Sequence, residues 1–257
     1  MPILPPPAAG FDLDVPILIV GAGACGLVAA LAANDAGAEV LVIEADAAPS
    51  GSTALSAGLI PAAGTRFQRE AGIEDTPQLF AQDIQKKAKG ENPQDLVDLL
   101  AEKSGTVIEW LADKFDLPFS VVTDFDYPGH SRRRMHGLPT RAGRELIDRL
   151  RTACETQGID IICNRRATSL IVEGDHVRGI RLEGPNGTED VGCDALILAC
   201  NGYGGNRNMV REFMPEIENA VWFGHDYNQG DAVTWGEALG AETLHLGAYQ
   251  GHGNVEI

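Results

Sequence analysis

Short apolar runs and longer amphipathic stretches alternate along the chain from residue 15 onward. Val15 to Val20 is almost wholly apolar, which is typical of a strand covered on both faces in a parallel sheet. Glu39 to Glu44 and Asp194 to Cys200 have the same character. Because segments with helical spacing separate these runs, the pattern predicts an α/β fold with a central parallel sheet.

Helical spacing of apolar residues predicts helices over residues 24–36, 76–89, 92–115 and 142–157. The third of these opens with Asn92 as the expected N-cap and Pro93 at the first helical position. Two further strands, joined near Glu173 to Asp175, are expected to project from the sheet as a hairpin. The parallel strands of the predicted sheet centre on Ile17, Val42, Ile161 and Ile197.

The turn after the first apolar run, GAGACG, has three glycines at the spacing of a nucleotide-binding turn. Gly21 would permit the sharp change of direction, Gly23 would let the backbone approach a pyrophosphate, and Gly26 would let the helix lie against the strand. The helix that begins near Ala24 would aim its positive N-terminal end at the phosphates. The alternative is a glycine turn that serves tight packing alone.

An acidic residue ends the second apolar run, 18 residues after Gly26. This residue, Glu44, is placed to accept hydrogen bonds from a ribose. An acid at this position favours a free 2′-hydroxyl, so FAD or NAD fits better than NADP.

Composition narrows the classes of partner. The chain has 20 Lys plus Arg against 37 Asp plus Glu, a net charge of -17, which argues against nucleic acid or an anionic membrane as a partner. The sequence shows neither a secretory signal nor a membrane-length apolar run, so a cytoplasmic location is expected. Its 5 cysteines form no CxxC pair, which disfavours a disulfide framework and predicts no metal site.

Residues 44–64, EADAAPSGSTALSAGLIPAAG, are rich in small and hydroxylated side chains. They form either an ordinary Gly/Ser loop or a segment that runs along an extended ligand. Together with GAGACG, this stretch resembles the flavin-binding start of the fumarate reductase and succinate dehydrogenase flavoprotein family. The soluble branch of that family includes urocanate reductases and 3-ketosteroid dehydrogenases.

The resemblance implies a Rossmann-like FAD-binding domain over residues 13–257, after an N-terminal arm at 1–12. Respiratory members attach FAD to a histidine in this loop, and no histidine occurs between Glu44 and Gly64, so non-covalent FAD is expected. Cys25 and Glu44 would contact the ADP half, and Ala167 would meet the adenine through its backbone. The segment from residue 52 to 58 would lie near the pyrophosphate and flavin. The cofactor-binding candidates of these segments are Gly21, Gly23, Ala24, Cys25, Glu44, Ser52, Thr53, Ser56, Gly58 and Ala167.

The third apolar run resembles the family's second nucleotide-contacting strand, which usually ends Ala-Thr-Gly-Gly. Cys200 and Asn201 replace the Thr and Gly here, which leaves backbone contacts from Asn201 and Gly202 as the expectation. The stretch NQGDAVTWGEALGA resembles the family's Gly-Asp-Gly turn and helix. That resemblance assigns Asp231 to the FAD site, and a helix N-cap is the equal alternative.

The segment YQGHG resembles the Gln-x-His-Pro of soluble fumarate reductases, which makes His252 the candidate catalytic residue, although Gly253 replaces the proline. The implied reaction is hydride transfer through flavin N5 to or from an activated carbon-carbon bond of a small carboxylate or ketone. The basic cluster HSRRRMH, residues 130–136, either steers an anionic substrate or forms a solvated loop paired with surplus acids.

Two other functions remain open. One is a non-catalytic FAD- or ADP-binding module, and the other is an NAD-dependent dehydrogenase, which the loop from Ser50 to Gly58 disfavours. Family members continue beyond the Gln-x-His segment into a capping domain and returning strands. We therefore expect this chain to lack those parts, to have the missing C-terminal part as a possible partner, and to reduce no enoate at a family-like rate alone.

Overall fold

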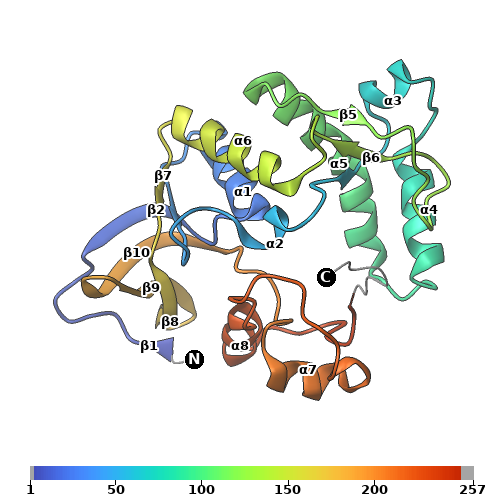
Figure 1. The fold of residues 1–257 in the computed structure, drawn as a ribbon. Coiled ribbons are helices and arrows are strands. Elements are labelled where there is room, and N and C mark those ends of the chain that lie inside the picture. The colour runs from blue at the N-terminus through green and yellow to red at the C-terminus, as the bar shows by residue number, and fades with distance from the viewer. Residues whose placement is uncertain (1–2, 250–257) are drawn as a thin grey trace. The chain divides into compact units, whose positions relative to one another are not determined.

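A computed structural model describes residues 3–249, and the chain forms two compact units. The first unit contains residues 1–52 and 150–257, and the second contains residues 53–149. Figure 1 shows the elements of both units along the chain. The predicted division into an arm and a single domain stays a prediction.

A seven-stranded, mostly parallel sheet forms the centre of the first unit, in the order β1-β8-β9-β10-β2-β3-β7. Strands β10, β2, β3 and β7 are mutually parallel neighbours, which confirms the predicted α/β sheet. The register pairs Ala195 with Ile17 and Ile17 with Val40. The strands are β1 (Ile3–Leu4), β2 (Leu13–Val20), β3 (Val40–Ile43), β7 (Asp160–Ile162), β8 (Arg166–Glu173), β9 (His176–Gly184) and β10 (Gly187–Leu198).

Strand β10 joins the parallel and antiparallel halves of this sheet. Its first part pairs antiparallel with β9, and residues 191–198 pair in parallel with β2. The predicted hairpin, β8 and β9, is therefore part of the same sheet, and β1 adds to it in parallel. Strand β10 begins at Gly187, well before the predicted strand at Asp194, because the antiparallel pairing extends it.

The core of the first unit lies between the sheet and the helices packed on it. Leu18, Ile43 and Trp235 are at most 1 % exposed, which buries the large side chains that drive this packing. The Cys154 thiol contacts the Leu27 carbonyl oxygen, where the end of α6 meets α1. The helices of this unit are α1 (Ala24–Asp35), α7 (Arg207–Phe213), η1 (Pro215–Ile217) and α8 (Asp231–Ala238). Two more helices, α2 (Gly51–Ala54) and α6 (Gly143–Thr156), contain residues of both units.

The second unit combines helices with a small antiparallel sheet of order β4-β6-β5. Phe80 and Ala81 pack against Val97 and Ala101, which joins two of the helices. The helix predicted from Asn92 begins at Gln94 with Pro93 as its N-cap, so the predicted side-chain cap at Asn92 is wrong. The elements are β4 (Ile60–Pro61), α3 (Arg66–Glu70), α4 (Pro77–Lys87), α5 (Gln94–Phe115), β5 (Ser120–Val121) and β6 (Met135–Gly137).

Within residues 3–249, no helix combines the length and apolar character that crossing a membrane requires.

Candidate functional site

The three glycines of the turn between β2 and α1 have different environments. A Cβ on Gly21, whose φ is +106°, would lie 2.6 Å from the Ala199 carbonyl oxygen. A Cβ on Gly26 would lie 1.8 Å from the Gly21 carbonyl oxygen. A Cβ on Gly23 would meet no atom of the described chain within 4 Å. Packing therefore requires the first and third glycines, whereas the second faces open space where a ligand can approach.

The N-terminus of helix α1 lies beside this turn. Its N-cap is Gly23, with no side-chain cap hydrogen bond within residues 3–249 and no acidic residue in the first turn. No acidic side chain of the first turn therefore offsets the positive end of this 12-residue helix, which suits a pyrophosphate site. Cys25 lies exposed in the first turn, at the position that the family resemblance gives to the ADP half.

Glu44 follows β3 directly and is only 7 % exposed. Its Oε2 accepts the Ala22 N–H at 2.7 Å, and its Oε1 accepts the Asp46 N–H at 2.9 Å. The carboxylate therefore holds the glycine turn in place. Because a carboxylate offers about four acceptor directions, it retains capacity for two ribose hydroxyls. Its ribose contact stays a prediction that this geometry fits.

Ser52 connects the loop after β3 to segments that follow β10. Its Oγ accepts from Asn201 Nδ2 at 3.0 Å, from Asn228 Nδ2 at 3.1 Å and from the His225 N–H at 3.3 Å. Asn201 has a φ of +67°, a left-handed conformation that asparagine tolerates better than most residues. This explains how Asn201 occupies a position where the family usually has glycine, and Gly202 then donates its N–H to Asn201 Oδ1.

Sequence reasoning missed a histidine in this cluster. His225 Nε2 lies 2.6 Å from Asp46 Oδ2, and Ser50 Oγ donates to the same oxygen at 3.1 Å. The Tyr227 ring lies 5.6 Å from the His225 ring, and the Arg166 guanidinium lies over Tyr227. The position of His225 in the sequence could have indicated it, because His225 lies five residues before Gly230 and Asp231, in the segment that resembles the family's Gly-Asp-Gly turn.

Asp231 is the first residue of α8 and does not cap it. The N-cap is Gly230, with a φ of +83° and no side-chain cap hydrogen bond, so the capping alternative is wrong. Asp231 Oδ1 is buried and has no hydrogen-bond partner in the described residues. Burial raises the pKa of this carboxyl group, and the nearby Arg166 charge partly opposes that shift. A buried acceptor without a donor suits a ligand hydroxyl.

Ala167 lies in β8 and is 5 % exposed. The ladder to β9 shifts register between Ala167 and Ser169, which marks a bulge or a similar irregularity at this point. Bulges redirect the local backbone and interrupt its regular pairing. This irregularity is compatible with the predicted backbone contact to adenine, which stays a prediction.

The remaining loop candidates belong to the second unit. Ser56 donates from both its N–H and its Oγ to the Thr53 carbonyl oxygen, and Ser56 Oγ accepts the Gly58 N–H at 3.0 Å. Gly58 has a φ of +61°, and a Cβ there would lie 2.9 Å from Gly143 Cα. The Ser56 hydroxyl thus orders its own loop, and the cofactor contacts of these residues stay predictions.

His252 lies outside the described residues, so its catalytic role stays a prediction. Among residues 3–249, no group of three or more His, Cys, Asp or Glu side chains is arranged to hold a metal ion.

The glycine turn, the N-terminus of α1 and the acid after β3 meet at the carboxyl ends of parallel strands, which defines a dinucleotide-binding α/β domain. A protein-family model described as FAD binding domain matches residues 16–252. The chain belongs to this family, and its cofactor is FAD.

Curated relatives are flavoenzymes of the fumarate reductase type. The probable fumarate reductase Ifc3 of Shewanella frigidimarina is 34 % identical over 254 residues, which cover 96 % of this chain and 42 % of the relative. The urocanate reductase of Eggerthella lenta is 27 % identical, over 95 % of this chain and 41 % of its own length. The chain therefore spans about two fifths of these relatives and belongs to an FAD-dependent oxidoreductase family.

Solved structures share the fold. The open conformation of a flavocytochrome c3 fumarate reductase matches with a TM-score of 0.85 and 33 % identity, covering 91 % of this chain and 42 % of that one. A 3-ketosteroid-delta4-(5alpha)-dehydrogenase from Rhodococcus jostii RHA1 matches with a TM-score of 0.83 over 96 % of this chain and 58 % of that one. At 22 % identity, the second match shows the fold alone.

Proposed function

We propose that this chain forms the FAD-holding part of an oxidoreductase that acts on an activated carbon-carbon bond. The reaction is either the reduction of an enoate or dehydrogenation next to a ketone. Relatives named as fumarate reductases and urocanate reductase support this class. When bound, FAD supplies hydride transfer through its N5 atom. The substrate is a small carboxylate or ketone, and neither nucleic acid nor a membrane is a partner.

The observation that carries the proposal is the open space at Gly23, beside the N-terminus of α1. Gly23 and the N-terminus of α1 bind the pyrophosphate, and Glu44 binds the ribose with its remaining acceptor capacity. Asp231 Oδ1, buried without a donor in the described chain, accepts from a hydroxyl of the cofactor. These contacts orient FAD in a site whose loop lacks an attachment histidine, so the cofactor is held non-covalently.

The first test concerns the cofactor. The purified chain is titrated with FAD, the change in flavin absorbance and fluorescence is followed, and bound protein is then precipitated with acid. We expect saturable binding and release of all flavin into the supernatant. Flavin that stays in the pellet would contradict non-covalent binding, and the absence of saturation would contradict the site itself.

The second test concerns the reaction. The FAD-loaded chain is reduced anaerobically and mixed with fumarate, urocanate or a 3-ketosteroid, with succinate as the saturated control. Reoxidation of the flavin by an unsaturated compound, slower than in full-length relatives and absent with succinate, is the expected result. Retained FAD with no reoxidation by any of these compounds would favour the alternative, a non-catalytic FAD-binding module.

A further inference from the structure

Three consecutive arginines in the second unit have three different environments. The side chain of Arg134 is fully buried and pairs with Asp75 at 2.7 Å and with Asp83 at 2.5 Å. Arg133 forms a more exposed pair with Asp126 at 2.7 Å. Arg133 and Arg134 therefore match one of the two alternatives for the basic cluster, in which its arginines pair with acidic residues. Their charges are therefore compensated within the unit.

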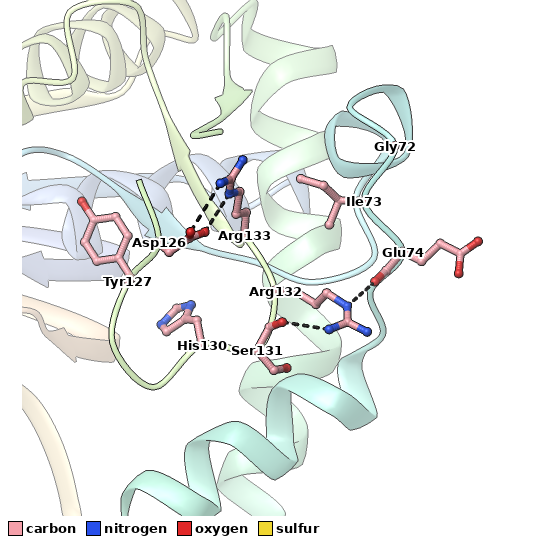
Figure 2. A pocket seen from close by; sticks show the side chains of 9 residues that line it. All are labelled: Gly72, Ile73, Glu74, Asp126, Tyr127, His130, Ser131, Arg132 and Arg133. Atoms are coloured by element: carbon pink, nitrogen blue, oxygen red, sulfur yellow. Dashed lines mark hydrogen bonds and ion pairs between the residues drawn. The ribbon is translucent and has the colours of Figure 1, made fainter. Parts of the chain in front are cut away.

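Arg132 is held differently, because both of its hydrogen bonds go to backbone carbonyl oxygens. Its Nε donates to the Glu74 carbonyl at 3.0 Å, and its Nη1 donates to the Ser131 carbonyl at 2.8 Å. No carboxylate in the described part of the chain forms an ion pair with Arg132. Figure 2 shows the guanidinium fixed by these two bonds, while the Glu74 carboxylate points away. The side chain is thus positioned but its charge is not neutralised.

Arg132 lines a pocket of about 620 Å³ that lies wholly within the second unit. This volume is in the range of small-molecule sites and is larger than an inorganic ion needs. Figure 2 shows Tyr127 and His130 on one side and Ile73 with Arg132 on the other. The pocket therefore combines one available cation with aromatic and aliphatic side chains. Of its two acidic lining residues, Asp126 is paired with Arg133 and the Glu74 carboxylate points away.

His130 adds a second polar group without a protein partner. Its Nδ1 is buried and has no hydrogen-bond partner within residues 3–249. Its ring lies 6.2 Å from the Phe80 ring and 6.3 Å from the Tyr127 ring, so neighbouring rings restrict it. Burial, together with the Arg134 charge, lowers the pKa of His130, which favours the neutral imidazole. A neutral imidazole carries one N–H that can donate to an acceptor.

We propose that this pocket binds a small organic carboxylate, with the Arg132 guanidinium paired to the carboxylate and the Tyr127 and His130 rings beside its body. A planar guanidinium pairs well with a single carboxylate. The net charge of -17 makes a monoanion a better ligand than a phosphate dianion. This inference does not depend on the proposed function.

The probe is benzoate, because it joins one carboxylate to a planar ring. It is titrated calorimetrically into the full chain with saturating FAD present, so that the pyrophosphate site is not available to anions. Benzamide, which has the same shape without the charge, is the matched ligand control. We expect saturable binding of benzoate and at least tenfold weaker binding of benzamide. Equal binding of the two would overturn the proposal, as would binding of inorganic phosphate but not of benzoate.

The variant Arg132→Gln should weaken benzoate binding at least tenfold. Arg149→Gln is the matched control, since it removes the same charge from an exposed pair on α6 outside the pocket, and it should change affinity less than twofold. His130→Phe keeps a ring between Phe80 and Tyr127 and should weaken binding severalfold. Equal losses in the Arg132 and Arg149 variants would show only a general charge effect and would overturn the site.

Discussion

The two units differ in whether their buried charged side chains have protein partners. In the second unit, Arg134 and Asp75 have fully buried side chains that pair with each other, and Asp83 completes the network. In the first unit, the buried Oδ1 of Asp231 has no partner among the described residues. A self-satisfied network serves the stability of its unit, whereas a buried acceptor without a partner in the described residues suits a donor supplied by a ligand. The contrast separates structural polar residues from ligand-binding ones.

The largest expected effect comes from breaking the satisfied network. Arg134→Met should lower the free energy of unfolding by about 3–5 kcal/mol, because it leaves the buried Asp75 carboxylate and the mostly buried Asp83 carboxylate without their cation. Urea unfolding followed by circular dichroism measures the loss. The neighbouring Arg133→Met removes only an exposed pair and should leave the free energy of unfolding nearly unchanged. Similar losses in the two variants would refute the assigned difference.

The glycine turn gives the next comparison. Gly26→Ala places a Cβ 1.8 Å from the Gly21 carbonyl oxygen, so unfolding should become easier by about 1–3 kcal/mol or more. Gly23→Ala meets open space and should leave stability within about 0.5 kcal/mol, while its methyl group obstructs the pyrophosphate. We expect the Gly23 variant to lose FAD affinity at unchanged melting temperature. Unchanged FAD affinity in a fluorescence titration would show that the pyrophosphate does not bind at this turn.

Glu44 supports the fold of the glycine turn and is also expected to bind the ribose of FAD. Glu44→Ala should weaken FAD binding by roughly 1.5–3 kcal/mol through loss of a charge-assisted ribose contact. It should also destabilise the chain without FAD by about 1 kcal/mol, because the Ala22 N–H loses its acceptor. Glu44→Gln keeps one acceptor oxygen and should fall between the alanine variant and the natural chain in both measurements. An alanine variant with normal FAD affinity would show that Glu44 serves only the turn.

Asp231 should give the smallest effect, with opposite signs for stability and binding. Its folded-state pKa is raised by burial, so its ionised form opposes folding, and stability falls as pH rises from the unfolded value of about 3.9 toward the folded one. Asp231→Asn removes this opposition and should raise the melting temperature at pH 7 by a few degrees. FAD binding should weaken by about 1 kcal/mol, as a charged acceptor becomes neutral. A lower melting temperature together with normal FAD binding would contradict both roles.

Short stretches of sequence were sufficient to predict much of the structure of the first unit. The apolar run at β2, the glycine spacing and the acid after β3 are contiguous, and their roles follow from strand and helix geometry. The same reasoning was less successful where partners are distant. Nothing near Ser52 in the sequence indicates that Asn201, Asn228 and the His225 backbone donate to its hydroxyl.

By itself, the sequence determined the parallel sheet, the nucleotide-binding turn and the resemblance to flavoproteins. Each of these is indicated by residues that lie close together along the chain. Only the tertiary structure decided that Arg134 is buried between two carboxylates while Arg132, two residues away, lines a pocket. The physical reason is that a charge is governed by the groups folded around it. Those groups come from positions up to 59 residues distant for Arg134.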